Sequence, residues 1–186
     1  MRRLALLLLA ATLQAATLRY WVQPCTRPES GCKTDDPELA QWAMEAWQSA
    51  SGGTLRLEKT ADRAQAHIRV YWVTGSDGLY GETRTVDVNG ERGAEVYVLP
   101  TVVPPGEKDQ LLRDAIVYLT CLHETGHALG LAHTADFADI MYSFGYGGDI
   151  VAYFERYRQM LKTRADIAAH SGISDADRVA IRQASR

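Results

Sequence analysis

Three of the five histidines of this 186-residue chain lie within eleven residues, between His123 and His133. An apolar-periodic stretch that starts near Glu107 precedes them, and it predicts a long helix that stops at Gly130. Residues four apart on a helix project from the same face, so His123 and His127 can bind one metal ion. The spacing therefore predicts a metal site at the end of a long helix, and the other elements have to fold around it.

The residues between and beside the histidines complete a catalytic type of site. Gly130 permits a positive φ angle, so the helix can end there and the chain can turn His133 back to the same ion. Three neutral imidazoles with one open position are typical of catalytic zinc, whereas structural zinc sites are closed. Glu124 can reach an activated water without binding the metal. We expect one zinc ion on His123, His127 and His133, with Glu124 as the general base. The less specific interpretation is a helix whose histidines only pack or face solvent.

The segment resembles the signature of the metzincin metallopeptidases, His-Glu-x-x-His-x-x-Gly-x-x-His followed by a methionine-containing turn. Met141 stands eight residues after His133 and supplies that turn. In the family this methionine packs beneath the zinc-binding histidines without binding the metal, and the resemblance implies the same role here. Tyr142 directly follows the methionine, and within that group this arrangement is most similar to the matrixins. The resemblance covers about residues 17–143 and 172–184.

Hydrophobic periodicity predicts the order of the elements. Strands are expected near residues 18–23, 55–57, 68–72 and 96–98. Helices are expected near residues 36–50, 107–129, 149–169 and 174–182. Asp36 offers an N-cap for the first helix, and Ser174 with Asp177 forms a capping box for the last. The pair Asn89-Gly90 is a strong signal for a hairpin turn.

The resemblance implies an α+β fold of the metzincin type. Its sheet is twisted, mixed and mainly parallel, with an antiparallel edge strand, and it packs on two long helices. A helical subdomain follows at the C-terminus, and zinc lies in the cleft between the two parts. We expect a catalytic domain over residues 17–186, with an upper part over 17–130 and a lower part over 131–186.

The first sixteen residues have the features of a secretory signal peptide. Arg2 and Arg3 precede an apolar run of ten residues, which is about half the length that a membrane-spanning helix needs. Small residues around Ala15 and Ala16 follow the run. The alternative is a buried N-terminal helix. We expect a secreted or periplasmic protein without a later membrane span.

The three cysteines agree with export. Cys25 and Cys32 enclose six residues that include a proline and a glycine, so a small disulfide loop is expected in an oxidising compartment. The alternative role for Cys25 is a contact to zinc, as in the latency motif of matrixin propeptides, but its neighbours do not match that motif. A propeptide of the matrixin kind is also not expected. Cys121 is flanked by apolar residues and is expected to be a buried, inert thiol.

Other cofactors have weaker support. The chain has no histidine between Val73 and Val103, so we do not expect the second, structural zinc of vertebrate matrixins. Calcium is an alternative that Asp77, Asp87 and Asn89 allow, although turns use these residues routinely.

The resemblance also indicates where a substrate binds. An extended peptide would pair with an edge strand near residues 78–83. A side-chain pocket beside the zinc would have Leu119 on its floor, and its wall would be the residues after Met141, including the segment from Tyr142 to Tyr146. For these apolar residues, plain core packing is the alternative.

Together these features predict a secreted zinc endopeptidase that acts on peptides or proteins. A formal net charge of −3 provides no electrostatic reason to expect a nucleic-acid partner. We expect a monomer. The alternative is an exported zinc-containing binding module without turnover, against which Glu124 argues, because a non-catalytic site has no need of that carboxylate. A third interpretation is a zinc hydrolase that acts on a non-peptide amide.

Overall fold

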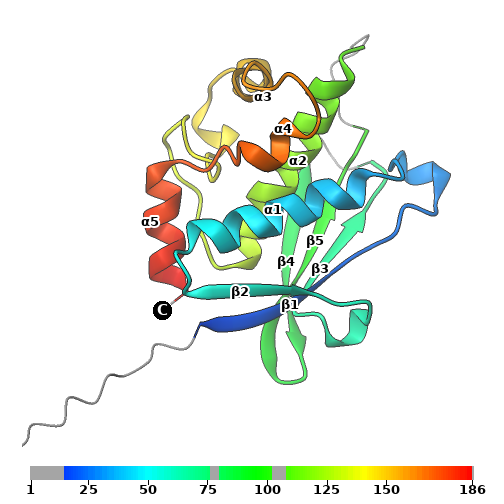
Figure 1. Ribbon diagram of the computed structural model, residues 1–186, viewed down its shortest axis with the longest axis vertical. Helices are drawn as coiled ribbons and strands as arrows, with labels where there is room; N and C mark the ends of the chain where they lie inside the picture. The colour runs from blue at the N-terminus through cyan, green and yellow to red at the C-terminus, as the bar shows by residue number, and fades with distance from the viewer. Residues whose placement is uncertain (1–14, 76–79, 102–107, 186) are drawn as a thin grey trace, which may run out of the picture.

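A five-stranded sheet forms the frame of the protein. The computed structural model describes residues 15–75, 80–101 and 108–185, so the expected signal peptide lies almost wholly outside the described residues. The strand order is β2-β1-β3-β5-β4 (Figure 1). The strands are β1 (Ala16–Val22), β2 (Leu55–Lys59), β3 (Ile68–Trp72), β4 (Gly81–Val88) and β5 (Glu91–Val98). The β1–β2, β1–β3 and β3–β5 pairs are parallel, and the edge strand β4 is antiparallel to β5, which confirms the expected sheet.

The alternation of side chains along the strands buries one face of the sheet. In β3, Ile68, Val70 and Trp72 are buried, while the residues between them are partly exposed. The β4–β5 hairpin turns at Asn89 and Gly90, whose φ angles are +55° and +85°. Two successive positive φ angles match the right-handed twist of paired strands, so the expected hairpin signal is confirmed.

Two long helices pack on each other and on the sheet. Helix α1 is Asp36–Ala50 and α2 is Gln110–Ala128 (Figure 1). The indole Nε1 of Trp47 donates to the carbonyl of Leu122 at 2.8 Å, which ties the two helices together inside the core. Burial of both helices is expected from their apolar periodicity. The C-terminal half of α2 lies beside the edge strand β4.

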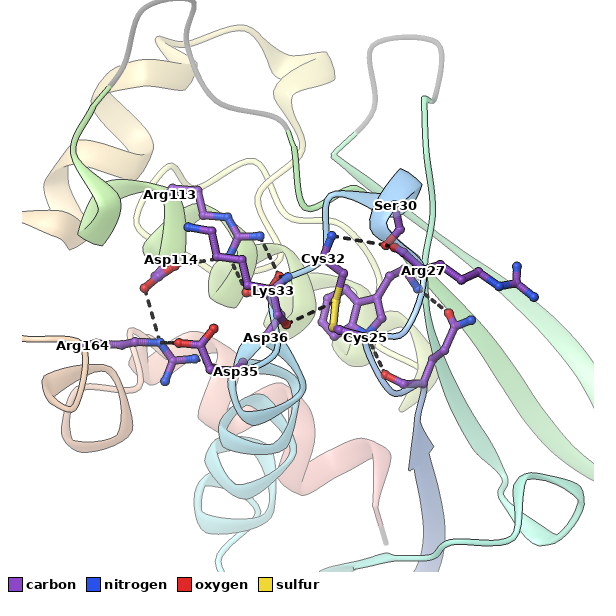
Figure 2. The surroundings of a disulfide bond; sticks show 12 residues. Cys25, Arg27, Ser30, Cys32, Lys33, Asp35, Asp36, Arg113, Asp114 and Arg164 are labelled. Carbon is purple, nitrogen blue, oxygen red and sulfur yellow. Dashed lines mark hydrogen bonds and ion pairs between the residues drawn. A yellow bond between two sulfur atoms is a disulfide. The ribbon is translucent and has the colours of Figure 1, made fainter.

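The expected N-cap role of Asp36 is wrong. The helix begins at Asp36 itself, and its buried carboxylate accepts hydrogen bonds from the Arg113 guanidinium on α2 and from the backbone N–H of Lys33. A buried carboxylate needs a charged partner, and the arginine across the interface satisfies it better than the helix terminus would. Figure 2 shows this pair beside the disulfide that joins Cys25 and Cys32.

Three shorter α-helices follow α2 along the chain. They are α3 (Ile150–Arg158), α4 (Asp166–Ala169) and α5 (Asp175–Ala184). The expectation of helix throughout 149–169 is wrong for the connection between α3 and α4. There the Asp166 carboxylate accepts from the backbone N–H groups of Lys162 and Thr163, and this local bonding competes with a continuous helix. The expected capping box of Ser174 and Asp177 is confirmed at the start of α5.

Helix α5 closes the fold by returning to the connection between α1 and β2. Arg182 donates to the carbonyl of Ala50 at 3.1 Å, and Ser185 lies within hydrogen-bond distance of Thr54. The C-terminal end of α5 therefore lies near β2 (Figure 1). Among the described residues, no helix combines the length and the apolar character that crossing a bilayer requires.

Candidate metal centre and its cleft

The three histidines converge on one point at the end of α2. The Nε2 atom of His133 lies 3.2 Å from Nε2 of His123 and 3.0 Å from Nε2 of His127. In a tetrahedral zinc site with bonds of about 2.0–2.1 Å, ligand nitrogens lie roughly 3.3–3.4 Å apart. The donor set and its spacing therefore fit one zinc ion.

A turn at the end of α2 brings His133 to the other two. Gly130 has a φ of +93°, its N–H donates to the carbonyl of His127, and the N–H of Leu131 donates to the carbonyl of Gly126. These two bonds are the Schellman pattern, which ends a helix at a left-handed residue. A residue with a Cβ would be strained there, so the glycine allows the chain to reverse within a few residues.

Backbone carbonyls orient two of the rings. Nδ1 of His123 lies 2.7 Å from the carbonyl oxygen of Ile140, and Nδ1 of His127 lies 2.9 Å from that of Leu131. A ring that donates from Nδ1 keeps the Nε2 lone pair free for a metal. Burial lowers the pKa of His123 to about 4 and also lowers that of His133. The neutral form, which metal binding requires, is therefore favoured in both rings.

Met141 is buried and lies against α2 near the histidines. A Cβ added at Gly126, which lies between His123 and His127 on the helix, would be only 2.4 Å from the Met141 sulfur. The N–H of Thr134 donates to the carbonyl of Met141 at 2.8 Å, which ties the turn to the residue after His133. This is the position that the resemblance assigns to the methionine beneath the ligands.

Glu124 is buried beside the metal centre, with 8 % of its surface exposed. Its Oε2 lies 2.7 Å from the Thr83 hydroxyl on β4. Burial raises the pKa of Glu124, because desolvation disfavours the charged form, and the hydrogen bond from Thr83 opposes this effect. The carboxyl thus lies at the edge of the cleft without being one of the converging metal donors.

An apolar cavity of about 440 Å³ opens beside the histidines. Leu119 and Tyr142 are among its lining residues. Tyr146 is 65 % exposed and is not among the lining residues, because the 3-10 turn Phe144–Tyr146 (η3) directs Phe144 inward instead. Phe144 lies in the segment expected to form the wall. Sequence reasoning missed four other lining residues, Tyr80, Ile150, Tyr153 and Phe154.

Some of the missed residues follow a local sequence pattern and others do not. Ile150, Tyr153 and Phe154 recur at helical spacing, so the periodicity of α3 could have indicated a shared face. Thr83 lies 41 positions from Glu124, and no local pattern predicts their contact. Aromatic packing joins the two sides of the cavity, since the Tyr80 ring lies 5.0 Å from that of Phe154.

The other candidate ligands have structural roles. Among the described residues, the only groups of three candidate ligands are the histidine triad and the group of Cys25, Cys32 and Asp36, in which the two sulfurs are bonded to each other. The Asp87 carboxylate accepts from the N–H of Gly90 in the hairpin turn, and Asp77 lies outside the described residues. Cys121 is free and buried, and burial raises the pKa of its thiol.

Comparison with known proteins adds one match. The family model described as Matrixin (Peptidase_M10) matches residues 13–150, which is more than half of the chain. The matched residues include the three converging histidines, Glu124 and Met141, and they end at the start of α3. A search of curated proteins found no match.

Proposed function

Because this chain belongs to the matrixin family of zinc metalloendopeptidases, we propose that Glu124 is the general base with which it hydrolyses peptide bonds. The zinc site is the triad of His123, His127 and His133. The observation that carries the proposal is the buried carboxyl next to the first metal ligand, at a cavity that a substrate can enter.

The reaction follows from this arrangement. When bound, zinc would act as a Lewis acid that polarises the scissile carbonyl and makes water a nucleophile at neutral pH. Glu124 takes one proton from the water as the water oxygen bonds to the carbonyl carbon. The same carboxyl then delivers that proton to the amide nitrogen as the C–N bond breaks. Glu124 returns to its ionised form, and the products are a new carboxyl terminus and a new amine.

The substrate is a peptide or protein chain, and β4 positions it. One side of β4 pairs with β5, and no strand of the described residues pairs with the other side, so an extended peptide can add along Gly81–Thr83. The cavity then receives the side chain next to the cut. Its wall is mainly aliphatic and aromatic, with Leu119, Tyr142 and Phe154 among its residues, so a large apolar side chain fits best.

Export is part of the proposal. Members of the matrixin family are typically secreted, and the bond between Cys25 and Cys32 suits an oxidising compartment. A signal peptide over residues 1–16 would direct the chain there. N-terminal sequencing of protein recovered from the medium or periplasm tests this, and a retained Met1 would contradict it.

The test of the proposed chemistry is a comparison between the parent and Glu124→Ala. Both zinc-loaded proteins are incubated with a peptide library, and the products are mapped by mass spectrometry. We expect the parent to cut and the variant to lose about two to four orders of magnitude in rate, which is the usual contribution of a general base.

Zinc content and thermal unfolding serve as controls, because Glu124 is not one of the three converging donors. Equal rates in parent and variant would sink the assignment of Glu124. A folded parent with one bound zinc and no cuts would favour a binding module instead.

A further inference from the structure

The side chain of Thr83 reaches from the edge strand to the candidate general base. Its hydroxyl oxygen lies 2.7 Å from Oε2 of Glu124 and 2.8 Å from the backbone carbonyl oxygen of the same residue. Thr83 is half-buried and lies in β4, between the exposed residues Glu82 and Arg84. Since side chains alternate along a strand, Thr83 faces α2 while those two neighbours face solvent.

The carboxylate is the better acceptor for the single hydroxyl proton of Thr83. The carbonyl of Glu124 lies within α2, whose backbone supplies its own donors. No backbone group of the described residues donates to the carboxylate, and hydrogen bonds to an ionised acceptor are shorter and stronger than those to a neutral one. Burial of Glu124 increases the difference, because a buried charge without a hydrogen bond is costly.

The backbone of β4 also confines the side chain of Glu124. A Cβ added at Gly81 would lie 2.7 Å from Cγ of Glu124 and 2.9 Å from Cγ2 of Thr120. The strand therefore lies directly against the Glu124 side chain, and only glycine permits this approach. Contact at Gly81 and the hydrogen bond from Thr83 together restrict the orientation of the carboxylate.

We propose that Thr83 is a positioning residue that holds Oε2 of Glu124, so that Oε1 is presented to the water and to the leaving nitrogen. This rests on the proposed function, in which Glu124 moves the proton. A carboxylate with one oxygen held has fewer unproductive orientations, and a general base must lie within hydrogen-bond reach of the proton it takes. Thr83 itself does not touch the reacting atoms.

The variants that test this differ in one group. Thr83→Val keeps the shape and removes the hydroxyl, whereas Thr83→Ser keeps the hydroxyl. Thr85→Val is the matched control, because Thr85 is an exposed residue two positions further along the same strand. We expect Thr83→Val to lower kcat by about tenfold to a hundredfold with little change in KM, since a hydrogen bond to a charged group is lost. Thr83→Ser restores most of the rate, and Thr85→Val leaves it unchanged.

Two further measurements do not depend on the activity of the Thr83 variant alone. In the Glu124→Ala background, Thr83→Val should reduce the residual rate no further, because the carboxylate it positions is absent. Crystal structures of the metal-free parent and of metal-free Thr83→Val should show one orientation of the Glu124 carboxylate in the parent and several in the variant.

The outcomes separate this inference from the proposed function. If the parent does not cut, or Glu124→Ala cuts as well as the parent, the proposed function fails. If the parent cuts and Thr83→Val matches its kcat, positioning by Thr83 is wrong. An equal loss in the Glu124→Ala background, a failed rescue by serine, or an unchanged carboxylate orientation would also overturn it.

Discussion

His123 shows how burial controls a single ligand. Its ring lies deeper in the protein than that of His133, and it donates from Nδ1 to the carbonyl of Ile140. Desolvation is the largest influence on its pKa, which falls to about 4 although the carbonyl favours the protonated form. The metal-free protein therefore keeps this ring neutral and ready for zinc over most of the physiological pH range.

We predict that the metal-free protein becomes less stable as the pH falls from about 6.5 to about 4. An unfolded histidine has a pKa of about 6.5. Between these values the unfolded chain binds a proton at position 123 and the folded chain does not. The free energy of unfolding therefore decreases as the pH decreases. The loss is at most about 3 kcal/mol for this residue. Urea titrations at several pH values measure it.

The control for this prediction is His123→Asn, which removes the titrating ring. Carboxylates titrate near the lower end of the same range, so the comparison concerns the difference between the two proteins. The variant should lose less stability than the parent over this pH interval. Equal pH dependence in the two proteins would show that His123 is not the group responsible.

Helix α3 contributes three residues to the wall of the cavity beside the histidines. It lies beyond the turn after Met141, and its residues Ile150, Tyr153 and Phe154 line the cavity beside the histidines. The Phe154 ring packs on Tyr80, next to the edge strand. This packing makes α3 part of the cavity wall, in addition to its contact with α2.

We predict that Ile150→Ala changes the cleavage preference of the enzyme, whereas Val151→Ala does not. The two residues are adjacent at the start of α3 and are 37 % and 47 % exposed, but only Ile150 lines the cavity. Shortening a lining side chain enlarges the cavity, so kcat/KM should rise for larger side chains relative to smaller ones. A library profile of both variants checks this. Identical profiles would mean that α3 does not contact the substrate.

At the scale of the whole molecule, distant segments close the fold. Arg113 on α2 pairs with Asp36 on α1, and Arg164, in the connection before α4, pairs with Asp35 and Asp114 (Figure 2). Arg164 also pairs with Glu38. The first of these pairs is buried, so removing one partner would leave an uncompensated charge. The bond between Cys25 and Cys32 closes the loop next to this cluster.

We predict that the double variant Cys25→Ser/Cys32→Ser is less stable than the parent by about 2–3 kcal/mol. The bond closes a short loop with a sequence separation of 7, and its removal restores conformational freedom to the unfolded chain. Thermal unfolding with and without reductant measures the effect. Reductant should lower the Tm of the parent and leave the double variant unchanged. A parent insensitive to reductant would contradict the prediction, provided that thiol titration confirms reduction.

Local patterns in the sequence predicted the parts of the fold that local physics controls. The spacing of His123 and His127, the turn at Gly130, the hairpin at Asn89-Gly90 and the capping box at Ser174 each depend on residues within a few positions of one another. The mainly parallel sheet with its antiparallel edge followed from the resemblance to a known family.

The wrong helix predictions have two sources, a distant charged partner and local side-chain bonding. Asp36 was expected to cap its own helix, but it pairs with an arginine 77 positions away. The connection between α3 and α4 instead reflects the local bonds of the Asp166 carboxylate, and Tyr146 is the last residue of the 3-10 turn Phe144–Tyr146.

The sequence by itself determined the metal, its ligands and the class of chemistry, because a helix places residues at fixed spacing on one face. Only the tertiary structure decided what surrounds them. The contact of Thr83 with Glu124 and the wall formed by α3 join residues far apart in the chain, and such contacts depend on how the sheet and helices pack. Packing also desolvates His123 and Glu124, so the protonation of the site is a property of the folded protein.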